Sequence, residues 1–447
     1  MHRTGSSTTL GERDNKGDDG LSRRQMLQGG LALAATMAAR NANSAGVQVS
    51  ASPPAPEFTV KLLEEREVIR DWWYPQRALF CRDGTIILPV SGTLAKSRKG
   101  EEKEEYILEA TFYSMDLGQT WRQKEALEIQ WTNKQGVVLP SNKALCIGQW
   151  RQLSDGSIMD IGGEGGNILD AMVRPEQAYR PWVSTVRRAK SPGELLKGNY
   201  VDDFAKIEIP NLAVIRGDSP NLTTGNACQV VEMENGDLIL PMEGRFNNDL
   251  VRVPYHPWVA YQFRSWLSRS TDCGHSWYYL STIASPAQHP LPTLSEGYCE
   301  PDVIRVDGAK LLAANRTGAN PTGNGSTERY TALVASISRD SGVTWEPPRE
   351  IYKYGVFPRL LKMSNGIIVC SSGRPGVFLL FSRDGGETWS KPYIVNDYHA
   401  AWGKCSSGYT SIGEIKPGVL CLFYDDVYTN AKGEISNLVK IAKYNVS

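Results

Sequence analysis

The chain has 447 residues and carries 49 basic and 49 acidic side chains, so its formal net charge is zero. This balance argues against a nucleic-acid-binding surface and against a protein that coats a polyanion. The eight cysteines contain no Cys-x-x-Cys pair, and the five histidines show no metal-ligand spacing, so we expect neither a metal nor a cofactor.

The first 45 residues are predicted to be an export signal that is not part of the fold. Arg23 and Arg24 precede a short apolar run, rich in Gly and Ala, from Leu27 to about Ala39, and small residues follow to Ala45. This arrangement resembles a twin-arginine signal, and the run is too short for a membrane span. It predicts a periplasmic or secreted protein. The alternative is a disordered basic tail beside an incidental apolar run.

Residues 46–60 are predicted to be a linker, and residues 61–447 a single folded domain. The linker contains the proline-rich run Ala51-Ser52-Pro53-Pro54-Ala55-Pro56. A mature chain of about 400 residues is long for one ordinary domain, so a fold built from repeated units is expected.

Six turn dipeptides, each followed by an apolar run, divide the domain. Asp-Gly and Asn-Gly between apolar runs are strong hairpin signals. The six dipeptides are Asp83-Gly84, Asp155-Gly156, Asn235-Gly236, Asp307-Gly308, Asn365-Gly366 and Pro417-Gly418. Successive dipeptides lie roughly 50 to 80 residues apart, which is room for a four-stranded blade and its loops.

Four copies of the pattern Ser-x-Asp-x-Gly-x-(Thr/Ser)-Trp follow hairpins one, three, four and five. They are Ser114–Trp121, Ser270–Trp277, Ser338–Trp345 and Ser382–Trp389. In such a turn the Asp accepts local backbone N–H groups, the Gly takes a positive φ and the Trp packs on the sheet. The second hairpin is followed only by a degenerate stretch near Ser191-Pro192-Gly193. Together the repeats predict an all-β fold, a six-bladed β-propeller with Asp-box turns at the outer edges of its blades.

Three arginines share one position relative to the hairpins. Arg245, Arg316 and Arg374 follow the turn glycine of hairpins three, four and five by eight or nine residues. A shared register would bring them to similar places on successive blades, where guanidinium groups bind a carboxylate through paired hydrogen bonds. The alternative is three separate, solvent-exposed arginines.

From roughly residue 65 to residue 445, these repeats and the segments after them resemble the sialidase superfamily, whose propellers carry the same BNR (Asp-box) repeat. Glu300, followed by the fourth hairpin and then Arg316, is similar to the family segment in which a Glu precedes the turn and an Arg closes it. Ser407–Ile412 resembles the segment that holds the family's nucleophilic Tyr. Arg374, eight residues before Ser382, matches another carboxylate-binding Arg.

The resemblance implies an exo-acting glycoside hydrolase that removes a terminal acidic sugar, with Tyr409 as the nucleophile, Glu300 as its base, and Arg316 with Arg374 as a clamp on the substrate's carboxylate. A neutral Tyr avoids repulsion by that carboxylate, but a phenol with a pKa near 10 needs a neighbouring base. The implied partner is a glycan, and we expect a monomer.

Two family features have no evident counterpart in the first blade. The family has an Arg followed by Ile-Pro before the first hairpin, whereas this chain has Tyr74-Pro75-Gln76-Arg77. Arg77, Arg70 or Arg245 is the candidate for the third cation. The family's general acid is an Asp after this hairpin. Here Glu102, in the acidic loop Lys96–Glu105, is the best-placed candidate.

These departures leave other functions open. The site could read another acidic sugar, such as a uronic acid. The chain could be a polysaccharide lyase in which Tyr409, His289 or His399 abstracts a proton. It could also be a non-catalytic propeller that binds carbohydrate or protein, in which case Glu300 and Tyr409 would lie apart or buried. Convergence of Glu300, Arg316, Arg374 and Tyr409 at one end of the axis is the discriminating observation.

Overall fold

A computed structural model describes most of one compact unit, Ala55–Ser447. The described residues are 57–92, 109–124, 127–132, 138–143, 150–162, 182–212, 224–225, 230–253, 260–318, 331–397, 406–433 and 435–447. The predicted signal, residues 46–56 of the predicted linker, Glu102 and His399 lie outside these ranges.

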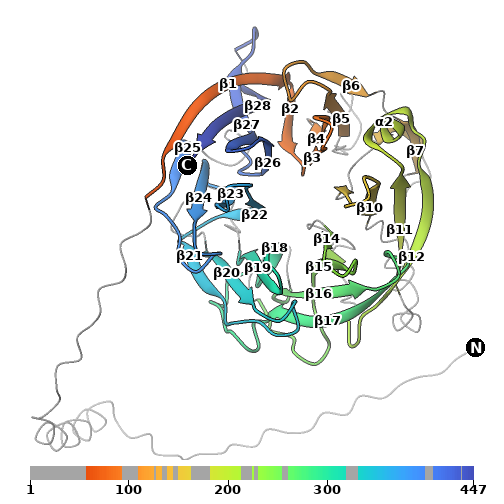
Figure 1. Cartoon of the computed structure of the whole chain (residues 1–447), viewed down its shortest axis with the longest axis vertical. Coiled ribbons are helices and arrows are strands. Elements are labelled where there is room, and N and C mark those ends of the chain that lie inside the picture. The colour runs from red at the N-terminus through yellow and green to blue at the C-terminus, as the bar shows by residue number, and fades with distance from the viewer. Residues whose placement is uncertain are drawn as a thin grey trace, which may run out of the picture. The chain divides into compact units, whose positions relative to one another are not determined.

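The described strands form six blades around a central axis, which confirms the predicted propeller (Figure 1). Blade one contains β2 (Trp72–Pro75), β3 (Leu79–Phe80), β4 (Ile86–Gly92), β5 (Glu109–Ser114) and β6 (Arg122–Lys124). Blade two contains β9 (Arg151–Gln152), β10 (Ile158–Gly162), β11 (Trp182–Ala189) and β12 (Val201–Glu208). Blade three contains β13 (Thr224–Gly225), β14 (Val231–Glu232), β15 (Leu238–Gly244), β16 (Arg264–Ser270) and β17 (Ser276–Ala284).

The second half of the ring is the more regular. Blade four contains β18 (Cys299–Asp307), β19 (Lys310–Arg316), β20 (Leu333–Ser338) and β21 (Arg349–Tyr352). Blade five contains β22 (Val356–Lys362), β23 (Ile368–Gly373), β24 (Val377–Ser382) and β25 (Tyr393–Asn396). Blade six contains β26 (Thr410–Lys416), β27 (Val419–Thr429), β28 (Ile435–Val446) and the N-terminal strand β1 (Val60–Arg70).

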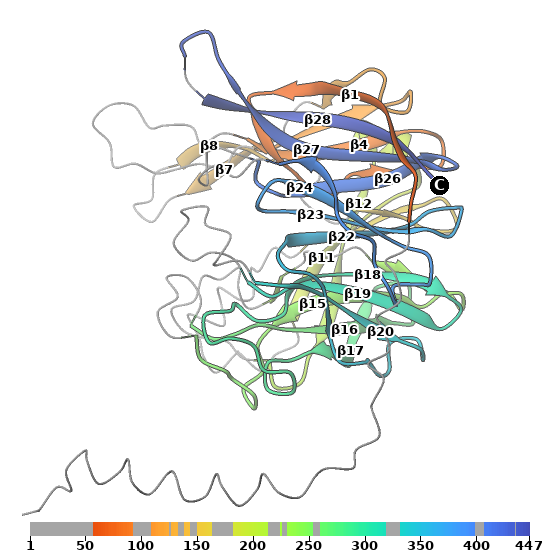
Figure 2. The same ribbon diagram turned by 90° about the vertical axis from the view of Figure 1, so that its left-hand side faces the viewer.

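Blade six closes the ring with both ends of the domain. β1 pairs with β28 in antiparallel register from Val60↔Val446 to Arg70↔Leu438, so the first strand of the domain is the outermost strand of the last blade (Figure 2). Closure of this kind covers sheet edges that would otherwise be exposed. Among the described residues, no helix has the length and apolar character needed to span a membrane.

The six turn dipeptides lie in hairpin turns, as the sequence predicted. In blades two, four, five and six they follow the first strand, as in β18–β19 and β26–β27, and in blades one and three they lie between β3 and β4 and between β14 and β15. Buried apolar side chains fill the spaces between neighbouring blades. One such cluster joins Leu379 of blade five to Leu422 of blade six, and another joins Ile158 of blade two to Ile87 of blade one. The core therefore lies between the blades and fixes their arrangement around the axis.

The four Asp boxes connect the third strand of a blade to its outermost strand. In the second box, Ser270 Oγ accepts the N–H of Gly274 at 2.7 Å, and Asp272 Oδ1 accepts the N–H of Ser276 at 2.9 Å. Gly274 has φ 86°, and the fully buried Trp277 donates its indole N–H to the Gly274 carbonyl at 3.0 Å. This confirms the predicted turn chemistry.

Blade two departs from the pattern. In place of a box it has α2 (Pro192–Lys197), a short helix capped by Ser191 at its start and by Gly198 in a left-handed conformation at its end. β12 also pairs in parallel with β17, so blades two and three share a nine-stranded sheet. Between blades one and two the chain forms a separate hairpin, β7 (Leu127–Thr132) with β8 (Val138–Lys143).

Candidate active site

Three blades begin with the same local distortion. Tyr74, Glu300 and Phe357 each precede a proline in the first strand of their blade and have φ values of 49°, 49° and 44°. The pairing register shifts at each of these points in β2, β18 and β22. A left-handed non-glycine residue at a bulge is strained and re-aims its side chain. The three distortions therefore place chemically different side chains at equivalent positions around the axis.

Tyr409 lies just before β26 and is positioned by the turn that precedes it. Gly408 has φ 78°, and a Cβ there would lie 2.5 Å from the backbone nitrogen of Arg374, so only glycine fits. The buried carboxyl of Asp425 accepts the Ser406 hydroxyl at 3.0 Å and the Ser407 N–H at 2.9 Å. Burial raises the pKa of Asp425 to about 6.

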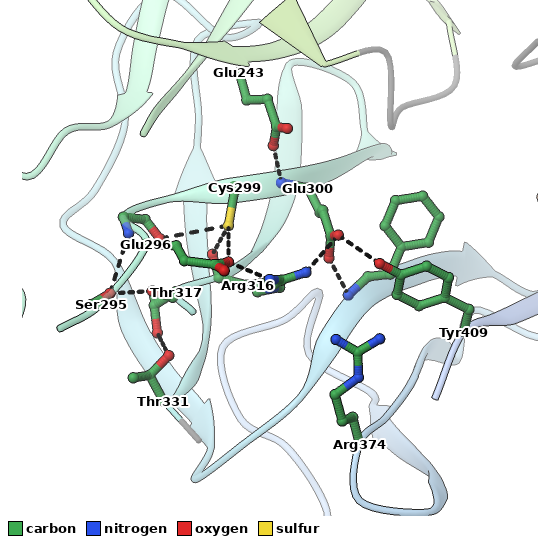
Figure 3. A network of polar contacts seen from close by, with 12 residues as sticks. Glu243, Ser295, Glu296, Cys299, Glu300, Arg316, Thr317, Thr331, Arg374 and Tyr409 are labelled. Atoms are coloured by element: carbon green, nitrogen blue, oxygen red, sulfur yellow. Dashed lines mark hydrogen bonds and ion pairs between the residues drawn. The ribbon is translucent and has the colours of Figure 1, made fainter. Parts of the chain in front are cut away.

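The carboxylate of Glu300 is the centre of the site. The Tyr409 hydroxyl donates to Glu300 Oε1 at 3.1 Å, and Arg316 Nη1 donates to the same oxygen at 2.7 Å (Figure 3). The backbone N–H of Phe357 donates to Glu300 Oε2 at 2.8 Å. Three donors from three blades thus hold one partly exposed carboxylate against a tyrosine hydroxyl.

Two arginines flank this pair, as the sequence predicted. Arg316 bridges Glu300 to Glu296, to which its Nη2 is also paired. Arg374 donates from Nε and Nη2 to the Ser407 carbonyl at 3.1 and 3.0 Å, and its guanidinium carbon lies 5.2 Å from the centre of the Tyr409 ring. The predicted convergence of Glu300, Arg316, Arg374 and Tyr409 is therefore observed, while their roles in a reaction stay predictions.

Burial and charge set the protonation of the site. Burial, and next the charge of Glu300, raise the pKa of Tyr409 to about 12. At neutral pH the side chain is therefore a neutral phenol that donates a hydrogen bond to Glu300. Behind Glu300, the carboxyl of Glu243 accepts the backbone N–H of Glu300. Burial, and next the charge of Glu300, raise the pKa of Glu243 to about 7.

Two aromatic rings that pack against Tyr409 were not predicted from the sequence. The Tyr74 ring meets Tyr409 edge-on at a centroid distance of 4.7 Å, and the Phe357 ring lies at the same distance on a tilt of 32°. Glu243 and Glu296 were missed as well. A usable signal was the proline that follows Tyr74, Glu300 and Phe357, six to eight residues before the turn dipeptide of each blade.

Two of the predicted carboxylate-binding arginines are engaged by the scaffold. Arg77 forms an ion pair with the buried Asp302, whose Oδ2 also accepts the N–H of Leu360 at 2.7 Å. Arg245 donates to the Tyr261 carbonyl at 2.6 Å and stacks on the Phe263 ring at 3.9 Å. These contacts join neighbouring strands and blades. We therefore do not include Arg77 or Arg245 among the proposed substrate-binding residues.

Of the remaining candidates, His289 is half-buried in the connection between β17 and β18, where its carbonyl accepts the Tyr298 hydroxyl at 2.9 Å. Glu102 and His399 lie outside the described residues. In the part of the chain that the structure describes, no group of three or more His, Cys, Asp or Glu side chains is arranged to hold a metal ion.

No family model and no curated protein matches the chain. Among solved structures, a protein of unknown function from Dyadobacter fermentans is similar over 87% of this chain and 99% of its own, with 14% identity and a TM-score of 0.58. The NanB sialidase of Streptococcus pneumoniae matches 88% of this chain and 70% of its own at 12% identity, with a TM-score of 0.45. A leech intramolecular trans-sialidase matches 84% and 68% at 14% identity, with a TM-score of 0.39. The first likeness supports the fold alone, and the two weaker ones add no argument about the site.

Proposed function

We propose that the chain is an exo-acting glycoside hydrolase of sialidase type that releases a terminal acidic sugar, sialic acid or a related one, from a glycan. One observation carries the proposal: the Tyr409 hydroxyl lies 3.1 Å from Glu300 Oε1, beside the guanidinium groups of Arg316 and Arg374. A half-buried phenol paired with a carboxylate base is the arrangement that a tyrosine nucleophile needs.

In the first step, Tyr409 Oη forms a bond to the anomeric carbon while the bond from that carbon to the leaving-group oxygen breaks. The phenolic proton passes to Glu300. The leaving oxygen takes a proton from a general acid, a role that we assign to Glu102. In the second step, water attacks the anomeric carbon, gives its proton to the carboxylate of that acid, and the sugar–Tyr409 bond breaks. Tyr409 then recovers its proton from Glu300.

The arginines explain why the substrate should be acidic. A carboxylate on the sugar would repel a carboxylate nucleophile but not a neutral phenol, and it would pair with guanidinium groups beside Tyr409. Arg374 is our main ligand for this carboxylate, because its guanidinium carbon lies 5.2 Å from the centre of the ring of Tyr409, the proposed nucleophile. Arg316 contributes the second positive charge and orients the base.

The test is a panel of fluorogenic sialosides and uronides, given to the wild type, Tyr409→Phe and Glu300→Gln. Tyr278→Phe, an exposed tyrosine on β17, is the matched control. We expect turnover of an acidic glycoside by the wild type and the control, its loss in the two site variants, and no unsaturated product absorbing in the near ultraviolet. Absence of turnover on every acidic glycoside, or an unsaturated product, would overturn the proposal.

We also propose that the protein is exported through a twin-arginine pathway, on the basis of Arg23-Arg24 ahead of a weakly apolar run. Replacing both arginines with lysine should leave the protein in the cytoplasmic fraction of the producing cell. Unchanged export of the double variant would contradict this.

A further inference from the structure

Glu243 reaches the site from the blade next to the one that carries Glu300. It is the penultimate residue of β15 in blade three, and only 9% of its surface is exposed. Its Oε2 accepts the backbone N–H of Glu300 across the gap between blades three and four, as Figure 3 shows. This contact is made to the backbone of the proposed base, whereas its carboxylate accepts from Arg316, Phe357 and Tyr409.

The Glu300 backbone needs such a partner. Glu300 has φ 49° and precedes Pro301, and both features disfavour its conformation. The pairing of β18 with β19 jumps from Cys299 to Asp302, so Glu300 lies in the bulge of the ladder. The Glu243 carboxyl satisfies an N–H that the bulge takes out of the sheet, and a buried N–H without an acceptor is costly.

The charges around Glu243 do not favour a carboxylate at this position. Three carboxyl groups, Glu243, Glu296 and Glu300, lie around one guanidinium group, that of Arg316, with the buried Cys299 thiol beside them. Glu300 and Glu296 oppose ionisation of Glu243, and Arg316 favours it. A third carboxyl therefore adds repulsion, and its structural contribution is the oxygen acceptor that it offers to Glu300.

We propose that Glu243 is a positioning residue of the proposed hydrolysis: its carboxyl oxygen holds the Glu300 backbone and so keeps the Glu300 carboxylate against Tyr409. The inference rests on the proposed function for its kinetic consequence, but the contact itself can be tested without any substrate. Two substitutions at Glu243 distinguish the position of the acceptor oxygen from the charge of the carboxylate. Glutamine keeps the oxygen and its reach without the charge, whereas aspartate keeps the charge and draws the oxygen back by one methylene group.

The experiment compares Glu243→Gln and Glu243→Asp with the wild type on whichever acidic glycoside is turned over. We expect Glu243→Gln to retain kcat within about threefold, and Glu243→Asp to lose about 10- to 100-fold in kcat with little change in KM, because a hydrogen bond to the base's backbone is lost. Glu234→Gln and Glu234→Asp are matched controls, since that residue is exposed near the opposite end of the same hairpin. Both controls should match the wild type.

The reverse order, with the aspartate variant active and the glutamine variant impaired, would show that charge matters and would overturn the proposal. So would equal kcat in both variants. Hydrogen exchange of the Glu300 amide gives a second measurement that is independent of activity. Protection should persist in Glu243→Gln and fall in Glu243→Asp. Equal protection in all three proteins would reject the contact, whereas failure of the wild type to turn over any acidic glycoside would reject the proposed function alone.

Discussion

The outer turns and the inner strand starts of this propeller are both repeated, but in opposite ways. At the outer turns, four blades carry nearly the same eight residues and make the same bonds, from Ser270 and Asp272 in one box to Ser382 and Asp384 in another. At the inner starts, three blades share one distorted backbone but present different side chains, namely Tyr74, Glu300 and Phe357. In this propeller, the repeated sequence lies in the scaffold. The proposed site instead repeats a backbone conformation and varies the side chains.

The largest effect should come from the inner ring, at Tyr409 and Glu300. Tyr409→Phe and Glu300→Gln should each lower kcat by about 1000-fold or more, and the double variant should be little worse than the slower single one, because the pair acts as a unit. Steady-state kinetics on the wild-type substrate checks this. Additive losses would show that the two residues act separately.

The high pKa of Tyr409 sharpens this prediction. With the base removed in Glu300→Gln, only the ionised phenol can react. Loss of the Glu300 charge lowers the pKa of Tyr409, but burial, the first cause of its raised value, remains in this variant. The residual rate should therefore climb with pH from 7 upward, by up to about tenfold per pH unit while the phenol is mostly protonated. A residual rate that is flat over this range would contradict the assignment of Glu300 as base.

Next in size should be the loss of Arg374. Arg374→Ala should lower kcat/KM for an acidic glycoside, because it removes a charged partner from a mostly buried site. The loss should correspond to about 2–5 kcal/mol of transition-state stabilisation. Arg374→Lys should also be impaired, because lysine keeps the charge but not the planar fork. Rates on the free acid and on its methyl ester are the comparison to make. Equal rates on the two would remove the carboxylate from the mechanism.

The outer turns should affect stability and spare the chemistry. A Cβ on Gly274 would lie 2.4 Å from Met159 Cε and at φ 86°, whereas Gly236, at φ 85°, has no atom within 4 Å of that position. Gly236→Ala should therefore cost only about 1–2 kcal/mol of backbone strain, and Gly274→Ala about 1–3 kcal/mol more from overpacking. Urea unfolding measures both. Loss of activity per folded molecule in Gly274→Ala would break the separation of scaffold from site.

The smallest effect concerns Glu243 and pH. Its pKa is raised from 4.5 to about 7 in the folded protein, so the folded state holds a proton more tightly and stability is lost as pH rises between those values. Glu243→Gln has no such loss. It should be more stable than the wild type by roughly 1–3 kcal/mol at pH 8, and this advantage should vanish near pH 4.5. A constant difference between the two pH values would contradict the buried, neutral carboxyl.

Much of the fold could be predicted because its signals are local. Each hairpin and each Asp box is specified within about ten residues by turn chemistry and one packed aromatic side chain. Blade two was less predictable because its outer part carries no Asp box. Its third and outermost strands are joined instead by α2, with Ser191 and Gly198 as its caps, and β12 pairs in parallel with β17 of the next blade.

The site was only partly predictable because its contacts join different blades. Glu300, Arg316, Arg374 and Tyr409 were found through a resemblance and a shared register. Glu243 has no local signal of its role, since the role of a Glu in a buried strand depends on its contact with the neighbouring blade. Register also misled. Arg245 shares the spacing of Arg316 and Arg374, yet its guanidinium group stacks on Phe263.

The most direct test of the central claim is to find which residue becomes bonded to the sugar. A fluorinated analogue of the substrate, whose electronegative substituent slows breakdown of the intermediate, should accumulate as a covalent adduct that peptide mass spectrometry can locate. The account predicts one sugar on Tyr409, formed in the wild type and absent from Tyr409→Phe. An adduct on Glu300, or turnover of the analogue with Tyr409 unmodified, would contradict it.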